Sequence, residues 1–259
     1  MTYALVTGAS KGIGKAIAFS LAKKKFNILL VARSEDLLKV IAADIKKEFT
    51  VAVDYLVVDL SVSTAASQVF EWCNKNNYQV NALINNAGYG LSGTFEKYDA
   101  AAYLNMMQLN MGTLISMTHI FLPMLKKQSS YILNIASTAA YQSVPGLGVY
   151  AATKSFVLSF SRSLNIELKN TSVSVTCVSP GGTNTDFGIR ADISGKATSM
   201  AQKVNMIAED VAEKAVRAML NKRTEVIIGT INKIGAFAAW LAPKKLAEYG
   251  AAKIYLSNK

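Results

Sequence analysis

Short apolar runs of strand length alternate with longer helical patterns along most of this chain. The runs carry too few polar residues to alternate between a buried face and a wet face, which is typical of a parallel sheet covered by helices on both sides. Right-handed crossovers between parallel strands then make the sheet doubly wound. We therefore predict an α/β fold with a seven-stranded parallel sheet. Strands are expected at 3–7, 27–32, 52–58, 81–85, 130–136, 172–178 and 225–228, and helices at 13–25, 35–48, 64–76, 101–127, 149–169 and 208–221.

Length and composition indicate one globular domain. The chain has 259 residues, of which 51% are hydrophobic and 17% charged, so it can bury a full core and global disorder is excluded. No linker, internal repeat or shift in composition divides it. We expect a single domain with a core at residues 1–230, an irregular substrate lid at about 183–206 and a helical extension at 231–259.

Cysteine, histidine and charge usage argue against several other classes of protein. Cys73 and Cys177 have neither a disulfide-framework spacing nor a metal-ligand spacing, and with a single histidine no metal site is expected. The net charge of +11 is compatible with nucleic acid or anionic lipid as a partner. The lysines are scattered in twos and threes without an aromatic-interleaved stripe, so no nucleic-acid binding is expected. No signal peptide or membrane-spanning run opens the sequence, and a cytoplasmic location is the default expectation.

The first predicted strand leads into a glycine-rich turn, TGASKGIG, with glycines at positions 8, 12 and 14. Glycines here allow a tight turn, a close approach of the backbone to a pyrophosphate, and tight packing of the next helix. The N-terminus of that helix offers unpaired N–H groups and a positive dipole end to a phosphate. The spacing is GxxxGxG rather than the more general GxGxxG. Such a turn favours nucleotide binding, although it can also be purely structural.

The second predicted strand ends in VARS, where a dinucleotide site distinguishes NAD from NADP. An acidic residue here holds the ribose hydroxyls of NAD, whereas a cation accepts the 2′-phosphate of NADP. The chain places Arg33 at this point and Lys11 inside the glycine turn, which predicts NADP(H) as the cofactor. Glu35 and Asp36 come slightly later and fit the first turn of a helix.

Polar residues also follow the next two strands. Asp59 and Leu60 end the third strand and suit the adenine rim of a nucleotide site, while a helix-capping role for Asp59 is an equally good interpretation. The segment NALINNAGYG places two asparagines and Ala-Gly at the end of the fourth strand, where the chain can pass close to a ribose. Asn110, inside a long helical pattern, indicates a local kink, a bound water or simply a tolerated polar residue.

The stretch from Tyr131 to Lys154 carries the residues that suit catalysis. Tyr150 and Lys154 are four residues apart at the start of a predicted helix, so their side chains share one helical face. A lysine ammonium favours the phenolate and lowers a tyrosine pKa from its usual value near 10, which makes proton exchange with an alcohol or carbonyl feasible. Ser137, just past the fifth strand, is placed to hydrogen-bond the same oxygen. Without other motifs, an ordinary core tyrosine and a surface lysine would be the simpler interpretation.

Taken together, these motifs resemble the short-chain dehydrogenase/reductase family. TGASKGIG, NNAG, the Asn110 segment, Ser137, YAATK and SPGGTNT occur in the order and approximate spacing of that family over residues 1 to about 230. The resemblance implies a Rossmann fold, with Tyr150 as the acid/base, Lys154 as its pKa modifier and ribose clamp, and Ser137 as the partner of the substrate oxygen.

The resemblance also implies a water held by Asn110, which links Lys154 to solvent. Thr183 and Thr185 would lie near the nicotinamide carboxamide. A homodimer or homotetramer is implied as well, with the helices at 101–127 and 149–169 forming the main subunit interface. The implied cofactor-lining set comprises Gly8, Ser10, Lys11, Gly12, Ile13, Gly14, Arg33, Asp59, Leu60, Asn86, Ala87, Gly88, Tyr150, Lys154, Pro180, Gly181, Thr183 and Thr185.

The end of the chain departs from the commonest pattern of that family. Residues 234–242 are apolar nearly all round, Pro243 breaks the pattern, and an amphipathic basic stretch follows. Nine apolar residues are far fewer than the ~20 that a transmembrane helix needs. We predict two helices at 231–256, buried against the domain or a sister subunit. Peripheral contact with an anionic membrane is the alternative.

The sequence therefore predicts an NADP(H)-dependent oxidoreductase that interconverts a carbonyl and a secondary alcohol. The rival interpretation is a non-catalytic NADP-binding sensor or scaffold protein. It is disfavoured because all four positions that the family uses for catalysis carry the family's residue types: Asn110, Ser137, Tyr150 and Lys154. Fold and motifs do not identify the substrate. Apolar residues in and around the predicted lid, such as Phe187 and Met206, indicate a fairly apolar molecule, although simple packing explains them equally well.

Overall fold

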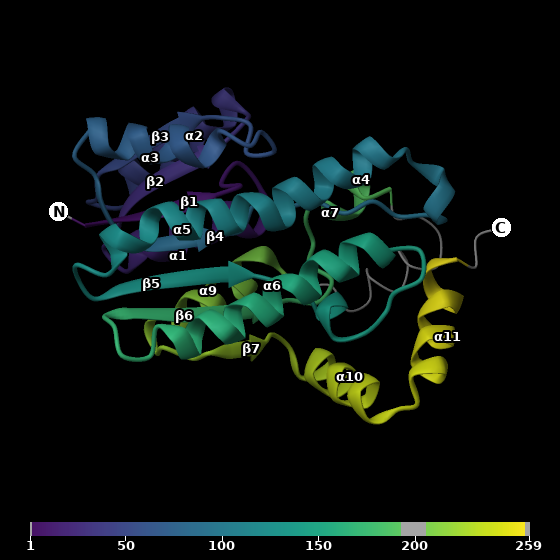
Figure 1. Cartoon of the computed structure of the whole chain (residues 1–259). Helices are drawn as coiled ribbons and strands as arrows, with labels where there is room; N and C mark the ends of the chain where they lie inside the picture. The colour runs from purple at the N-terminus through teal and green to yellow at the C-terminus, as the bar shows by residue number, and fades with distance from the viewer. Residues whose placement is uncertain (1, 193–205, 257–259) are drawn as a thin grey trace.

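The computed structural model describes residues 2–192 and 206–256. Seven parallel strands form one sheet in the order β3-β2-β1-β4-β5-β6-β7, which confirms the predicted fold class (Figure 1). The order reverses between β1 and β4, so a crevice opens outside the carboxyl ends of these two strands. The strands are β1 (Thr2–Thr7), β2 (Asn27–Ala32), β3 (Val53–Val57), β4 (Gln79–Asn85), β5 (Ser130–Ile135), β6 (Val173–Ser179) and β7 (Glu225–Ile227).

Helices cover both faces of the sheet, which explains why the strands are apolar on both sides. Along β1, Ala4 and Val6 belong to a buried cluster on one face, while Leu5 belongs to a cluster on the other. The first cluster is closed by α1, α2 and α9, and the second by α3, α5 and α6. The helices are α1 (Gly12–Lys23), α2 (Glu35–Glu48), α3 (Ala65–Lys75), α4 (Ala100–Met107), α5 (Thr113–Leu125), α6 (Gly148–Glu167), α7 (Phe187–Arg190), α9 (Ala208–Leu220), α10 (Thr230–Leu241) and α11 (Lys244–Tyr255).

The helix predicted at 101–127 is not a uniform α-helix. A π-helical turn, η2 (Gln108–Gly112), lies between α4 and α5 and contains Asn110. Such turns insert an extra residue and are frequent at functional sites. Of the interpretations that the sequence left open for Asn110, a local irregularity of the helix is the one that the structure shows. Two short 3₁₀ turns, η1 (Phe95–Lys97) and η3 (Thr138–Tyr141), follow β4 and β5.

The end of the chain forms the two predicted helices: α10 follows the edge strand β7, and α11 lies beyond the carboxyl ends of the strands (Figure 1). Ala251 of α11 is buried in the same cluster as Tyr103, Leu147 and Tyr150, so this helix packs next to the start of α6. Of the helices in the described ranges, none is both long and apolar enough to span a bilayer.

Candidate active site

The loops after β1 and β4 are tied together at the crevice. The Thr7 hydroxyl donates to the Ile84 carbonyl at 3.0 Å and accepts from the backbone N–H of Asn86 at 2.9 Å. The Asn86 side-chain amide donates to the Thr7 carbonyl at 2.9 Å and to the Gly8 carbonyl at 3.3 Å. The NNAG segment thus holds the glycine turn in place, and the cofactor contact of Asn86 stays a prediction.

The glycine turn is shaped as a cradle for a phosphate. Gly8 has a φ of +65°, a left-handed conformation that favours glycine. A Cβ at Gly14 would collide with the Gly8 carbonyl and with the Asn86 amide, so only glycine fits. Helix α1 begins at Gly12 with no acidic residue in its first turn, which leaves the positive end of its dipole uncompensated. These features fit the pyrophosphate of a dinucleotide.

Both cations that the sequence assigns to the 2′-phosphate have acidic neighbours. Arg33 lies 3.9 Å from Asp59, and both side chains are about half exposed. Lys11 forms a 2.7 Å ion pair with Asp186, which follows β6. A 2′-phosphate at this position would compete with two carboxylates for these cations.

Asp59 caps the turn that follows β3. Its carboxylate accepts from the Ser61 backbone N–H at 2.9 Å and from the Ser61 hydroxyl at 2.8 Å. The backbone hydrogen bond from Ser61 is the main cause that lowers the pKa of Asp59, and the charge of Arg33 adds to it. The residue therefore has a local structural role, and its contact with an adenine stays a prediction.

Tyr150 and Lys154 lie on one face of α6, as their spacing requires. Lys154 is only 5% exposed, and its ammonium donates to the Ile135 carbonyl at the end of β5 at 2.9 Å. Its Nζ lies 5.8 Å from the centroid of the Tyr150 ring. Burial lowers the pKa of Lys154 to about 8. A cation held in such a costly environment is typical of a functional site.

Ser137 and Asn110 occupy defined positions around this pair. The Ser137 hydroxyl oxygen accepts from the Ala139 backbone N–H at 3.1 Å, which leaves its hydrogen able to donate. The Asn110 amide donates to the Tyr89 carbonyl at 2.9 Å and to the Thr153 hydroxyl at 3.0 Å, so both of its side-chain donors are used. Asn110 thus holds the loop after β4 against α6, and its role in binding water stays a prediction.

The segment after β6 crosses in front of the glycine turn. A Cβ at Gly12 would touch the Thr185 methyl group, and the Phe187 ring lies 5.2 Å from the Tyr150 ring. The Pro180 carbonyl accepts from the Thr138 backbone N–H at 2.9 Å, so this segment is also fixed to the loop that carries the serine. Most of the predicted lid, residues 193–205, lies outside the described part of the chain.

The crevice thus brings together most of the predicted residues. Gly8, Gly12 and Gly14 lie in the turn, the asparagine segment packs on it, and the segment at 180–187 covers it. Ser10 and Ile13 belong to the same turn, and Ala87 is fixed by an N–H bond to the Thr7 hydroxyl. The remaining predicted positions, Leu60 and Gly88, each lie three residues beyond the last residue of the strand that precedes them, β3 and β4.

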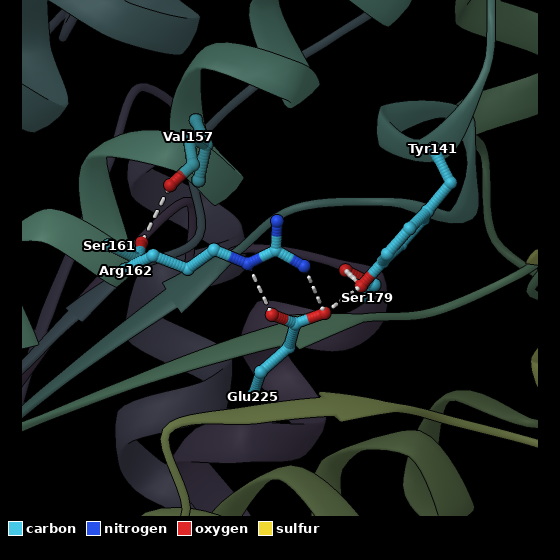
Figure 2. Close-up of polar contacts among 6 residues, drawn as sticks. All are labelled: Tyr141, Val157, Ser161, Arg162, Ser179 and Glu225. Atoms are coloured by element: carbon cyan, nitrogen blue, oxygen red, sulfur yellow. Dashed lines mark hydrogen bonds and ion pairs between the residues drawn. The ribbon is translucent and has the colours of Figure 1, made fainter. Parts of the chain in front are cut away.

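A polar cluster that the sequence did not reveal fixes the loop of Ser137. Glu225 of β7 accepts from Arg162 of α6 at 2.6 and 2.9 Å and from the Tyr141 hydroxyl at 2.7 Å (Figure 2). Tyr141 also bonds to the Ser179 hydroxyl at 3.2 Å. Burial alone would raise the pKa of Glu225, but the bonds from Arg162 and Tyr141 outweigh it and lower the pKa. These residues lie far apart in sequence and carry no motif, so only the fold brings them together.

Loss of the Glu225 charge is expected to destabilise the protein. Glu225→Gln should lower the free energy of unfolding by ~1.5–3 kcal/mol, because it weakens hydrogen bonds to a charged group that is largely shielded. Glu213→Gln is the matched control, since Glu213 pairs with Arg217 on the exposed surface of α9 and should change stability by less than ~1 kcal/mol. Urea denaturation of both variants measures the difference, and equal losses would show that the cluster has no special role.

Comparison with known proteins agrees with this geometry. Residues 2–196 match the family model described as short chain dehydrogenase. An uncharacterized oxidoreductase of Staphylococcus saprophyticus is 32% identical over 83% of this chain and 90% of its own length. The NADP-dependent 3-hydroxy acid dehydrogenase of Schizosaccharomyces pombe is 32% identical over 88% of this chain and 90% of its own length.

A solved structure supports the same assignment. A short-chain dehydrogenase from Sphingobium yanoikuyae in complex with NADPH has a TM-score of 0.81 and 27% sequence identity, covering 100% of this chain and 96% of its own. The glycine turn, the asparagine segment and the Tyr150–Lys154 pair lie where a parallel sheet of this topology binds its ligands. The chain is therefore an oxidoreductase that belongs to the short chain dehydrogenase family.

Proposed function

We propose that the protein is an NADP(H)-dependent enzyme that interconverts a carbonyl and a secondary alcohol, with Tyr150 as the acid/base. The observation that carries this proposal is the buried ammonium of Lys154, 5.8 Å from the Tyr150 ring and bonded to the last residue of β5. Burying a lysine is costly, and a purely structural hydrogen bond to a carbonyl would not need a charge. A cation beside a tyrosine favours the phenolate and so enables proton transfer.

Each residue then has one task. The bound nicotinamide would exchange a hydride with the carbonyl carbon. Tyr150 would donate a proton to the carbonyl oxygen in reduction and accept one from the alcohol in oxidation, a step that typically contributes ~10²–10⁴-fold. The free hydrogen of Ser137 would orient the same oxygen, and Lys154 would stabilise the phenolate. Asn110 would keep the loop after β4 at the correct distance from α6.

The cradle of the glycine turn and α1 would hold the pyrophosphate, and Lys154 would contact a ribose. Arg33 and Lys11 support a preference for NADP(H), since each would gain a doubly charged partner in place of a half-exposed carboxylate. Two relatives point the same way: the yeast dehydrogenase is named as NADP-dependent, and the Sphingobium structure contains NADPH.

An apolar cleft supports a fairly apolar substrate. It has a volume of about 390 Å³ and lies beside the first turn of α6, where Gly148 and Val149, the two residues before Tyr150, line it. Its walls carry no charged side chain, so the part of a ligand that fills it would be uncharged. The end of α11 contributes to it. The lining residues are Leu91, Gly93, Thr94, Phe95, Tyr103, Gly146, Gly148, Val149 and Leu256.

NADPH oxidation across a panel of carbonyl compounds tests the proposed reaction. Ketones with apolar substituents are expected to react with higher kcat/KM than charged ones of the same size.

We also propose that the protein forms a homo-oligomer through α5 and α6, where Ile115 and Ile166 are exposed.

Removal of the Arg33 charge is expected to erase the cofactor preference. The wild type should bind NADPH roughly tenfold to over a hundredfold more tightly than NADH, because a charge-assisted hydrogen bond is worth ~1.5–3 kcal/mol. Arg33→Ala should lose most of this difference and leave NADH binding nearly unchanged. Lys39→Ala, at an exposed ion pair on α2, is the control and should preserve it. Calorimetric titration of the three proteins with both cofactors measures all six affinities, and equal binding of both cofactors by the wild type would refute the role of Arg33.

A further inference from the structure

Helix α10 is apolar on two opposite faces. Ala236 and Ala239 on its inner face are buried, as predicted for this stretch. On the outer face, Ile231, Ile234 and Leu241 are 68%, 63% and 69% exposed. Their spacing of three and seven residues places them along one stripe of the helix. The domain therefore does not cover this face, and its burial against a sister subunit stays a prediction.

Aromatic side chains extend the stripe. Phe237 and Trp240 are both mostly exposed, and their ring centroids are 5.9 Å apart. Leu246, at the start of α11, is equally exposed. Exposed apolar patches of this kind mark interaction sites. We call the following residues the tail surface: Ile231, Ile234, Phe237, Trp240, Leu241 and Leu246.

A basic cleft adjoins the tail surface. It has a volume of about 430 Å³ and lies between α9, β7 and the first turn of α10. Thr230 and Lys233 line it, and Ile234 and Phe237 follow on the same helical face at i, i+3, i+4 and i+7. The cleft therefore opens next to the apolar stripe. Its cationic lining residues are Lys214, Arg217, Arg223 and Lys233.

The segment that carries the tail surface contains charges of one sign. The sequence contains no acidic residue between Glu225 and Glu248, whereas Lys233, Lys244 and Lys245 fall within that interval. A symmetric contact between two copies of this surface would bring its lysines together, since a two-fold interface uses the same patch twice. An anionic lipid surface would neutralise them instead.

We propose that the tail surface docks on an anionic lipid membrane, with α10 lying in the plane of the interface and the basic cleft facing lipid phosphates. A helix with apolar and aromatic residues on one side and flanking lysines binds membranes in this way. Tryptophan prefers the boundary between headgroups and acyl chains because its ring is apolar and its N–H is polar. This proposal is independent of the reaction proposed above.

The fluorescence of Trp240 tests the proposal in the full-length protein. The chain has two tryptophans, so Trp72→Phe leaves Trp240 as the only reporter. Vesicles of phosphatidylserine and phosphatidylcholine should shift its emission to the blue and co-sediment with the protein, and phosphatidylcholine alone should do so much less. Ile234→Gln with Phe237→Gln should lower the partition coefficient by at least ~10-fold. The two substitutions remove apolar side chains whose transfer from water into the membrane would favour binding.

Charge reversal in the cleft should have a comparable effect. Arg223→Glu with Lys233→Glu should lower the partition coefficient by at least ~10-fold, since each basic residue near an anionic surface contributes roughly fivefold. The matched controls are Lys46→Glu with Lys47→Glu on α2, which changes net charge equally, and Val40→Gln with Val62→Gln, which removes exposed apolar side chains outside α5, α6 and the tail surface. Both controls should bind vesicles like the wild type.

Two results would overturn the proposal. One is a wild type that neither co-sediments nor shifts its emission with either kind of vesicle. The other is an oligomer, detected by light scattering without lipid, that dissociates in the Ile234→Gln, Phe237→Gln variant, because the tail surface would then be an interface between copies of the chain.

Discussion

Tyr150→Phe is expected to fold and to bind NADPH like the wild type, and to turn over carbonyl substrates at least ~10²-fold more slowly. The Tyr150 ring is buried in a cluster with Leu147 and Ala251 and lies beside the Phe187 ring. Phenylalanine keeps this packing and removes only the hydroxyl. We therefore expect kcat to decrease, because the proton donor is absent. Steady-state kinetics with NADPH, together with a thermal denaturation curve, separate the catalytic effect from an effect on stability.

Tyr98→Phe is the matched control, because Tyr98 packs against the same cluster and its hydroxyl donates to the Ser92 carbonyl at 3.2 Å. Its turnover should stay close to that of the wild type.

Ser137→Ala should lower turnover with cofactor binding intact, because it removes the second contact to the substrate oxygen. A Tyr150→Phe protein that works at the wild-type rate would end the proposed mechanism. A wild type that binds NADPH and reduces none of the panel would instead favour a sensor or scaffold protein.

Lys154→Met is expected to impair the enzyme twice. It removes the charge that favours the phenolate, so turnover should fall at least ~10²-fold, as for the tyrosine variant. It also removes a ribose contact, so NADPH should bind more weakly to the lysine variant but not to Tyr150→Phe. Titration of both variants with NADPH distinguishes these effects. Unchanged NADPH affinity in Lys154→Met would show that the ammonium does not contact the cofactor.

The same substitution is expected to stabilise the free protein at neutral pH. Burial lowers the pKa of Lys154 from 10.5 to about 8. Below pH 8 the ammonium is charged in both states, and its loss of hydration on folding lowers the free energy of unfolding by the full amount. This shift corresponds to about 3 kcal/mol at pH 7, and the net gain in the free energy of unfolding for Lys154→Met should be roughly 1–3 kcal/mol.

The stability difference between the two proteins should depend on pH in one direction. Between about pH 8 and pH 10.5 the folded state loses the Lys154 proton before the unfolded state does, so the wild type gains stability relative to the methionine variant. The advantage of methionine should be largest below pH 8 and nearly gone above pH 10.5. Urea denaturation at both ends of this window measures it, with the exposed Lys39→Met as a control that shows no such trend. A difference independent of pH would contradict a depressed pKa for this lysine.

The sequence by itself determined the fold class and the order of the motifs. Apolar runs such as Ile28–Ala32 need cover on both faces, which only a parallel sheet between two helical layers supplies. Gly8 and Gly14 were recognisable because their roles depend on local geometry, a left-handed turn and a close backbone contact. Tyr150 and Lys154 share a face because helical spacing alone dictates it. Asparagine in a helical pattern at position 110 left a kink, a bound water and a tolerated polar residue as alternatives, and the structure shows a π-helical turn there.

Only the tertiary structure decided which charged groups meet. Glu225 lies 63 residues from Arg162 and 84 from Tyr141, and their contacts exist because β6 and β7 pair beside α6. The ion pair of Lys11 with Asp186 spans 175 residues and follows no local pattern. The tail was undecided for a similar reason. The sequence of a helix that is apolar on all sides does not indicate which side packs against the domain. In the structure the domain covers the side of α10 with Ala236 and Ala239, and the side with Ile234 and Trp240 is exposed.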